Sequence, residues 1–398
     1  MVRINLGSLS FVFLNFCFLS SGNKCFSTNL QNVTIHSEHA AKHNISYKIH
    51  CITTKDGYHL SLFHVYDNTA NDVASRQPVL IQHGLGANAL EFTIEINDMI
   101  SMAYYLVKNG FNVWVGNARG SLFSQSHNYL RISDRKFWNF SFHEMGVIDV
   151  PSMLESIYEK TSKQNKIIYI GHSMGTNLLG VYASSLKDHA KKFLKRAVLI
   201  SPVILMKHTK VKLLKVPQLF EFIFAKLQAF GFHSLFSEKS LEKRLLRELC
   251  VFRDNFDFCG ALLQIANGKP SKPPKDFVKE LLMTWPDQVS IKTLRHFLQT
   301  IISRGKAPMY NYGPRYNKIL YNSAVVPKYD IEGIQVPCHI FYGEQDVLAP
   351  KEDAELLYST LTSEKTIQGV SNFNHIDFII GKDVVQKFFI YLVKILNK

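Results

Sequence analysis

One stretch of the chain decides the fold: residues 166–183, with the sequence KIIYIGHSMGTNLLGVYA. Lys166–Ile170 is β-branched and aromatic and predicts a strand, and Thr176–Ala183 predicts a packed helix. Ser173 stands between them in the pattern Gly-x-Ser-x-Gly, which is typical of a nucleophile elbow. Such a turn leaves no room for side chains at the flanking glycines and lifts the serine hydroxyl above the sheet edge. Ser173 is therefore the predicted nucleophile.

Strand-like runs recur along the chain and alternate with helical stretches. This rhythm is typical of an α/β fold with a mostly parallel sheet. A hairpin around Asp56-Gly57, within Tyr47–Val65, is expected at the edge of that sheet. The other expected strands are Pro78–Gln82, Phe111–Val115, Arg196–Ile200, Cys338–Tyr342 and Thr366–Gln368.

The rhythm breaks over residues 203–335, where helical stretches rich in Phe and Lys replace the strands. We expect a helical cap to be inserted into the core at this point. The core then has two parts, residues 23–202 and residues 336–398. The phenylalanines of Leu219–Phe236 either pack inside the cap or face a substrate or an interface, and both readings stay open.

The first 22 residues are typical of a secretory signal peptide, with an early cation, the apolar run Leu9–Leu19 and small residues at Ser20–Gly22. No later stretch approaches the roughly 18 apolar residues of a membrane span. We therefore expect a secreted or lysosomal lumenal protein without a transmembrane segment after cleavage. The predicted glycosylation sites are Asn32, Asn44 and Asn139.

The number of cysteines limits how they can pair with one another. Of the 6 cysteines, Cys17 lies in the leader, so an odd number remains and at least one is expected to be unpaired. We expect Cys250 and Cys259 to be bonded, because an oxidising compartment favours closure of a short loop. The sequence contains neither Cys-x-x-Cys nor a Cys/His cluster, so we expect no metal site.

The net charge of +14 suits an anionic lipid surface better than nucleic acid, because the cations are spread along the chain and no nucleic-acid motif is present.

A serine nucleophile needs a histidine base that is oriented by a carboxylate, and folds with this elbow have the chain order serine, acid, histidine. Asp346 follows the expected strand Cys338–Tyr342 and is the predicted acid. Glu344 and Asp353 are alternatives, although the first lies nearer the strand and the second falls in an expected helix. His375, in the loop between the last strand and the terminal helix, is the predicted base.

Acyl transfer also needs amide donors aimed at the developing oxyanion. The amide of Met174, directly after the nucleophile, is one expected donor. The second is expected from the loop after the first long strand, at Leu85. His83 and His172, which flank these positions, are expected to be structural.

Further motifs occur in the order found in the acid lipases, the family of gastric and lysosomal lipases, which the chain resembles over Tyr47–Leu396. The resemblance implies an α/β-hydrolase core, a helical cap with a mobile lid, and hydrolysis of triacylglycerol or sterol esters at a lipid surface without a cofactor. It assigns the triad to Ser173, Asp346 and His375, the oxyanion amides to Leu85 and Met174, and the disulfide to Cys250 and Cys259. The motifs that carry it, besides the elbow, are Thr54–Leu60, His83–Leu85, Val113–Gly120, Phe137–Phe142, Glu144-Met145, Asp149–Pro151 and Asn374–Phe378.

The chain departs from this family at Gly86 and Met174, where leucine and glutamine are usual, so the preferred ester is not implied. The first hypothesis is a secreted or lysosomal serine ester hydrolase that cleaves neutral lipid esters through a Ser-His-Asp acyl-enzyme. A carboxylesterase for small soluble esters is the alternative. A noncatalytic lipid-binding protein is a third reading, but it would be expected to lack Ser173, Asp346 or His375, and all three are present.

Overall fold

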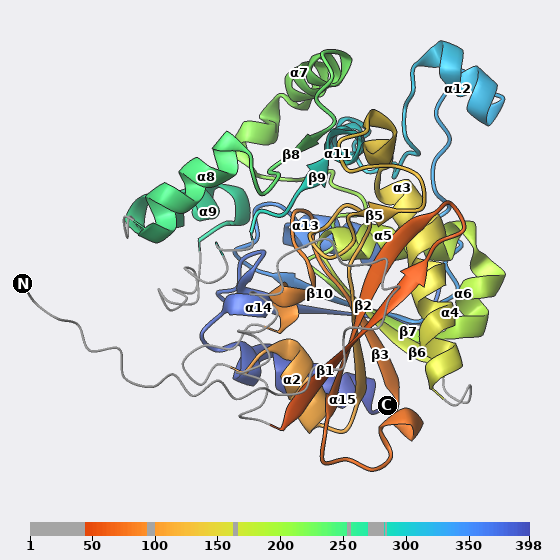
Figure 1. Ribbon diagram of the computed structural model, residues 1–398, viewed down its shortest axis with the longest axis vertical. Helices are drawn as coiled ribbons and strands as arrows, with labels where there is room; N and C mark the ends of the chain where they lie inside the picture. Colours follow the sequence, from red (N-terminus) through yellow and green to blue (C-terminus); the bar gives the residue numbers. More distant parts are fainter. Residues whose placement is uncertain (1–43, 94–99, 162–165, 253–255, 270–281, 283–284) are drawn as a thin grey trace, which may run out of the picture.

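The computed structural model describes residues 44–93, 100–161, 166–252, 256–269, 282 and 285–398. A large sheet crosses the molecule (Figure 1). In spatial order its strands are β1 (Ile45–Thr53), β2 (Tyr58–Asp67), β4 (Asn112–Gly116), β3 (Pro78–Gln82), β6 (Ile167–His172), β7 (Leu194–Ile200), β10 (Cys338–Gly343) and β11 (Lys365–Val370). Neighbouring strands are parallel from β4 to β11 and antiparallel among β1, β2 and β4. The short β5 (Ser126–His127) pairs with β2. The predicted α/β fold class is therefore confirmed.

Every strand expected from the sequence is present. The bounds of β3 match the expectation, and the bounds of the other long strands differ by one or two residues. The edge hairpin turns at Asp56-Gly57, with Thr53 paired to His59 and Gly57 at φ +96°. A positive φ of this size favours glycine, which explains the residue at the turn.

The two faces of the sheet bury different side chains because residues alternate along a strand. Leu80 and Tyr169 belong to the core under α4 (Val150–Lys160), α5 (Met174–Ser185) and α6 (Lys187–Phe193). Val79 and Ile81 belong to the core under α2 (Met102–Lys108) and α15 (Ile390–Leu396). The sheet is thus a middle layer between helices, which fixes the loops at its strand ends.

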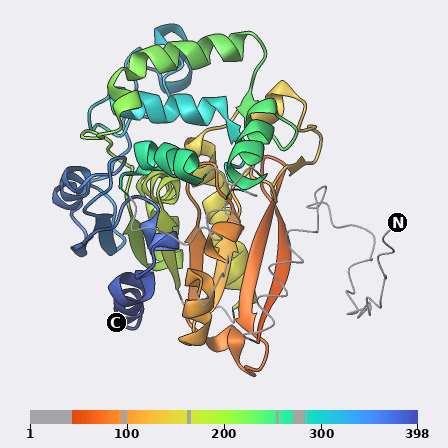
Figure 2. The same cartoon turned by 90° about the vertical axis from the view of Figure 1, so that its left-hand side faces the viewer.

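The segment between β7 and β10, here called the cap (residues 203–335), is mainly helical and lies beyond one end of the sheet (Figures 1 and 2). Its described part contains one short ladder, β8 (Ser234–Leu235) paired with β9 (Val289–Ser290). Helix α11 has a strongly one-sided apolar pattern, and α7 packs along it. The described helices are α7 (Pro217–Ala229), α8 (Leu241–Arg247), α9 (Phe256–Asn267), α11 (Ile291–Ile302) and α12 (Pro314–Tyr321).

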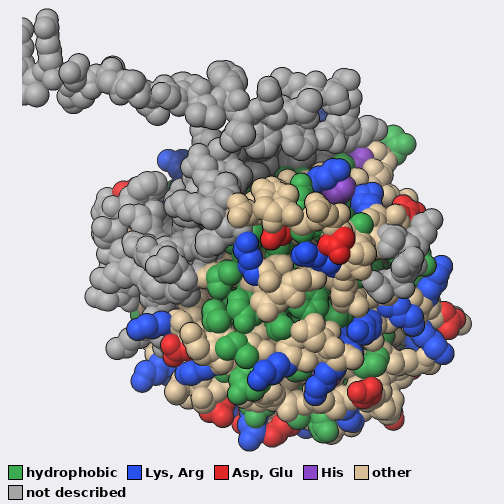
Figure 3. Space-filling view, turned by 90° about the horizontal axis from the view of Figure 1, so that it is seen from below, with side chains coloured by type: hydrophobic (Ala, Val, Ile, Leu, Met, Phe, Trp, Pro, Cys, Tyr) green, Lys and Arg blue, Asp and Glu red, His purple; other side chains and the backbone are tan. Residues whose placement is uncertain are grey.

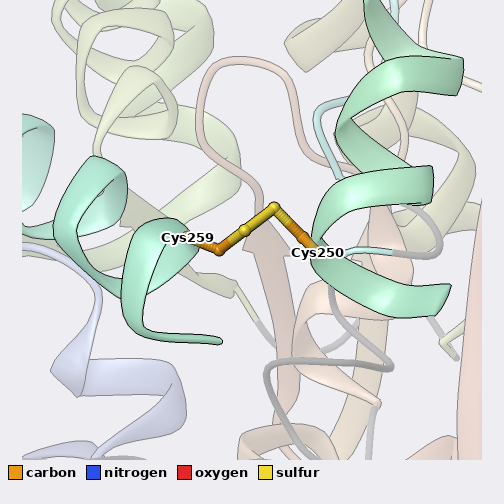
Figure 4. Close-up of a disulfide and its surroundings, with 2 residues drawn as sticks. All are labelled: Cys250 and Cys259. Carbon is orange, nitrogen blue, oxygen red and sulfur yellow. A yellow bond between two sulfur atoms is a disulfide. The ribbon is translucent and has the colours of Figure 1, made fainter. Parts of the chain in front are cut away.

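The cap contains the disulfide that the sequence predicted (Figure 4). Cys250 and Cys259 are bonded, with 5.8 Å between their Cα atoms, and Leu282 packs beside them. Cys338 in β10 is a buried free thiol, as expected for an odd number of cysteines. Cys51 is also disulfide-bonded. Cys25, the expected signal peptide and Asn32 lie outside the described residues.

The surface shows where charge and possible modification sites lie. On the face seen in Figure 3, which looks from below at the side away from the cap, Lys and Arg are scattered among acidic and apolar side chains. The predicted glycosylation sites Asn44 and Asn139 are exposed. Among the described residues, no helix combines the length and apolar character of a membrane span.

Candidate active site

Ser173 occupies a strained turn between β6, which ends at His172, and α5, which begins at Met174. Its backbone has φ +51° and ψ −117°, a conformation that costs about 1–3 kcal/mol for a residue other than glycine. A Cβ atom on Gly171 would lie 2.7 Å from the backbone of Gly175, and one on Gly175 would lie 2.4 Å from the carbonyl oxygen of Gln82. The two glycines of the motif are therefore required by the close approach of the backbone.

The structure brings the three residues of the predicted triad into one hydrogen-bonded row. Ser173 Oγ lies 2.8 Å from His375 Nε2, and His375 Nδ1 lies 2.9 Å from Asp346 Oδ2. A carboxylate only accepts, so Nδ1 carries the proton and Nε2 is free to accept the serine proton. All three side chains are largely buried. This arrangement can take a proton from the serine hydroxyl.

Asp346 is oriented by the backbone that follows it. Its Oδ1 accepts from the amides of Leu348 and Ala349, at 2.9 and 2.8 Å, which leaves Oδ2 for His375. The two alternatives from the sequence lie elsewhere. Glu344 is exposed, and Asp353 accepts from the amides of Lys207 and His208.

The loop that carries His375 is fixed from two sides. Within the loop, Asn374 Oδ1 accepts from the amide of Asp377, and Asp377 Oδ2 accepts from the amide of Asn374. From the cap, the carbonyl of Asn267 accepts from the amide of His375 at 3.2 Å, and the carbonyl of Gly268 accepts from Asn374 Nδ2. The end of α9 therefore supports the predicted base, a contact for which the sequence carries no local signal.

The backbone segments that carry the predicted oxyanion amides lie next to Ser173. The Met174 amide is the first of α5, and the first amides of a helix have no acceptor within it. Gly84, the residue before Leu85, packs so closely that a Cβ atom on it would lie 3.2 Å from Ser173 Cβ. Leu85 and Met174 also line one small cavity of about 20 Å³, to which Gln288 and Val289 of the cap contribute.

Asp287 joins the cap to the loop after β3, and sequence reasoning missed it. Its amide donates to the carbonyl of Gly86 at 2.6 Å, and its buried carboxylate accepts from Asn88 Nδ2 and from the amides of Leu122 and Gln288. Burial raises the pKa of Asp287 to about 6, although these donors and the charge of Lys243 oppose the rise. No regular pattern in the sequence singles out an aspartate in an irregular cap segment.

Arg119 explains why several motifs far apart in the sequence belong together. Its guanidinium is buried, pairs with Asp56 of the hairpin turn and with Asp149, and lies 4.1 Å from the ring centre of Tyr58. These contacts tie the edge hairpin to the loop after β4 and to the start of α4. Both carboxylates are hydrogen-bonded to the one guanidinium, which fits a structural role for the cluster. Among the described residues, no group of three or more His, Cys, Asp or Glu side chains could hold a metal ion.

The fold and the elbow define an α/β hydrolase. The alpha/beta hydrolase fold family matches residues 77–382, and a partial alpha/beta-hydrolase lipase region matches residues 36–96. The chain therefore belongs to the α/β-hydrolase family, and within it to the acid lipases, which are carboxylic ester hydrolases.

Several named lipases are similar to this chain over most of its length. Triacylglycerol lipase 2 of Arabidopsis thaliana is 31% identical over 86% of this chain and 84% of the relative. Gastric triacylglycerol lipase of Bos taurus is 29% identical over 88% of this chain and 87% of the relative. Among solved structures, a soluble variant of monoglyceride lipase from Saccharomyces cerevisiae has a TM-score of 0.56 at 15% identity, covering 88% of this chain and 94% of that one. That structural likeness concerns the fold alone.

Proposed function

We propose that the protein hydrolyses esters through an acyl-enzyme formed on Ser173. The observation that carries this proposal is the unbroken row from Ser173 through His375 to Asp346, with contacts of 2.8 and 2.9 Å. His375 takes the serine proton as Ser173 Oγ attacks the ester carbonyl carbon, and it then gives that proton to the leaving alcohol. In the second half, His375 takes a proton from water as the water oxygen attacks the acyl carbon. The bond between that carbon and Ser173 Oγ then breaks, His375 returns the proton to Oγ, and the free acid leaves.

The amides of Leu85 and Met174 are the proposed donors to the oxyanion in both halves. Each would act where negative charge develops, and one such donor typically contributes a factor of about 10²–10³ to kcat. Support comes from the first-turn position of Met174 and from the close packing of the Gly84 backbone on Ser173.

We propose neutral lipid esters, triacylglycerol or cholesteryl ester, as the substrates. The names of the relatives support this class, since they include triacylglycerol lipases and a candidate lysosomal acid lipase/cholesteryl ester hydrolase of Crotalus adamanteus. The surface of α7 supports it independently. Leu219, Phe222 and Phe230 in or directly after this helix are 53%, 56% and 81% exposed, and the exposed Lys215 and Lys226 flank them. Exposed apolar side chains flanked by cations suit an anionic lipid surface.

We propose that the cap, residues 203–335, acts as a lid over the site. Ser173 is 7% exposed, and the cavity beside Leu85 and Met174, at about 20 Å³, has room for about one water molecule. Entry of a long-chain ester therefore requires the cap to move. The disulfide Cys250–Cys259 and the expected leader support secretion or a lysosomal lumen as the destination.

The decisive experiment compares wild type with Ser173→Ala on emulsions of a triacylglycerol and of a cholesteryl ester, at acidic and at neutral pH. We expect turnover by wild type to vanish in the variant while the fold, followed by circular dichroism, is kept. Hydrolysis that persists in Ser173→Ala would overturn the mechanism. A rate that does not rise when substrate passes from monomer into droplets would favour the small-ester carboxylesterase, and absence of labelling by a serine-directed phosphonate would favour the lipid-binding protein.

A further inference from the structure

Two buried side chains beside the triad have no part in the proposed transfer steps. His172 directly precedes the nucleophile, and Glu91 lies in the turn Ala89–Phe92 after β3. Their side chains are 2% and 10% exposed. The contacts that they make join the loop after β3 to the loop of His375, so they connect the two parts of the site that have to be held together.

The contacts of the His172 ring determine how many protons it needs. Its Nε2 lies 2.8 Å from the carbonyl oxygen of His375, which only accepts, so Nε2 carries a proton. Its Nδ1 is buried, has no regular hydrogen bond with any other described group, and lies 3.3 Å from Glu91 Oε1. With one ring proton, the Nδ1 lone pair would face a carboxylate. The repulsion between this lone pair and the carboxylate disappears only when His172 and Glu91 together hold one further proton.

Glu91 also contacts the loop that carries the proposed oxyanion donor. Its Oε2 accepts from the amide of Gly84 at 3.3 Å. A Cβ atom on Gly84 would lie 3.5 Å from His172 Nδ1 and 3.2 Å from Ser173 Cβ. The loop therefore has little freedom while Glu91 stays in place, and Leu85 follows directly after Gly84.

We propose that Glu91 and His172 share one proton, and that this proton holds the Gly84-Leu85 backbone and the His375 loop in the geometry required for acyl transfer. Both are positioning residues, because neither touches the reacting atoms. The inference rests on the proposed function, since the backbone that is positioned carries the proposed oxyanion donor. When the proton is lost, Glu91 turns away from Nδ1 and releases the Gly84 amide.

The surroundings favour the charged pair. Burial lowers the pKa of His172, but the hydrogen bond and charge of Glu91, the carbonyl of His375 and the charge of Asp346 outweigh it and raise the pKa above its ordinary value. His83 also faces the pair. Its Nε2 accepts from the amide of Ala118 and its Nδ1 donates to the carbonyl of Gly84, so its contacts fit the neutral ring, and burial lowers its pKa.

The direction in which activity depends on pH follows from the raised pKa of His172. The shared proton is present at acidic pH, and its contribution is lost as pH rises through the pKa of His172 in the folded protein. The positioning of the Gly84-Leu85 backbone, and the activity that depends on it, should therefore be lost as pH rises through that pKa.

The test uses Glu91→Gln, which can satisfy the same partners without the extra proton. The amide oxygen of glutamine can accept from Gly84, and its amide nitrogen can donate to the Nδ1 lone pair of a neutral His172. We would measure kcat/KM on p-nitrophenyl butyrate, a monomeric ester, across the pH range. We expect the ratio of variant to wild type to rise at least about tenfold between about pH 5 and pH 9.

A ratio that stays constant across pH would overturn the proposal, because a merely structural glutamate would lower activity equally at every pH. Glu355→Gln is the matched control, since this side chain is 54% exposed and pairs with Lys351 at 3.5 Å along its own helix. The control should follow the wild-type profile. Wild type that neither hydrolyses esters nor reacts with a phosphonate would instead disprove the proposed function.

A second measurement decides the shared proton without activity. In protein labelled with ¹⁵N-histidine, one buried ring should still be an imidazolium at a pH just above the ordinary histidine pKa of about 6.5. The same ring should be neutral at that pH in Glu91→Gln. If every histidine has the same charge state in wild type and in Glu91→Gln, the proposal is overturned. This test does not require an active enzyme.

Discussion

The amide of His375 donates to the carbonyl of Asn267, at 3.2 Å, and this contact ties the proposed base to the last residue of cap helix α9. Cys259 lies in the same helix and is bonded to Cys250. The disulfide is therefore attached to the helix that contacts the loop of the proposed base. The position of the base depends on the cap as well as on the sheet.

Removing the disulfide should therefore reduce activity as well as stability. We expect the double variant Cys250→Ser and Cys259→Ser to lose about 2–3 kcal/mol of unfolding free energy, because a short loop is no longer closed in the unfolded chain. We also expect kcat on a monomeric ester to fall while the core still folds. Urea unfolding and steady-state kinetics on one preparation check both, and an unchanged kcat would show that α9 does not support His375.

Asp346→Asn should lower kcat by about 10⁴-fold with little change in KM, because an amide no longer selects the tautomer with the proton on His375 Nδ1. The matched control is Glu344→Gln, because Glu344 directly follows β10 and is exposed to solvent. Full activity in the control and loss in the variant assign the acid to Asp346. The reverse result would move the acid to Glu344.

Gly175→Ala should disrupt the elbow, since the added Cβ atom would lie 2.4 Å from the carbonyl oxygen of Gln82 and neither backbone can yield. We expect a loss above about 2 kcal/mol in stability and loss of phosphonate labelling. Gly260→Ala in α9 is the control, because a Cβ atom there meets no heavy atom within 4 Å. Alanine in a helix should leave stability equal or raise it by up to about 1 kcal/mol.

Asp287→Asn should change how stability depends on pH. Burial raises the pKa of Asp287 to about 6 in the folded protein, above its ordinary value of about 3.9. The folded state thus binds this proton more tightly than the unfolded state, and stability falls as pH rises from about 4 to about 6.

Asparagine cannot ionise, so the variant should gain on wild type by about 2–3 kcal/mol between about pH 4 and pH 7. Unfolding free energies at both pH values test this expectation. A constant difference between the two proteins would mean that folding does not change the pKa of Asp287. The same variant should lower kcat, because the carboxylate and amide of Asp287 brace Asn88 and Gly86 beside Leu85.

The sequence predicted the features that depend on neighbouring residues. Pro78–Gln82 forms strand β3, as a short apolar run between turn residues predicts. The two flanking glycines predicted the turn at Ser173. Asp346 and His375 followed from chain order at the strand ends, and the structure places them within hydrogen-bonding distance of one another.

Contacts between segments far apart in the chain could not be predicted from the sequence. Asp287 reaches Asn88, 199 positions away, and His172 reaches His375, 203 positions away. No periodicity connects such pairs, because they meet only when the cap and the core loops pack together. His172 was expected to be structural, and its contact with Glu91 became visible only when the loop after β3 was placed against the elbow.

The buried thiol of Cys338 bears on how the chain matures. An odd cysteine in an oxidising compartment can attack a neighbouring disulfide, and only its thiolate does so. Burial raises the pKa of Cys338 to about 12, and its sulfur lies 3.2 Å from the carbonyl oxygen of Val336. Once β10 has docked between β7 and β11, this thiol is withdrawn from exchange. Insertion of one strand thus protects the cap disulfide from rearrangement, and a chain delayed before that step would be the form exposed to mispairing.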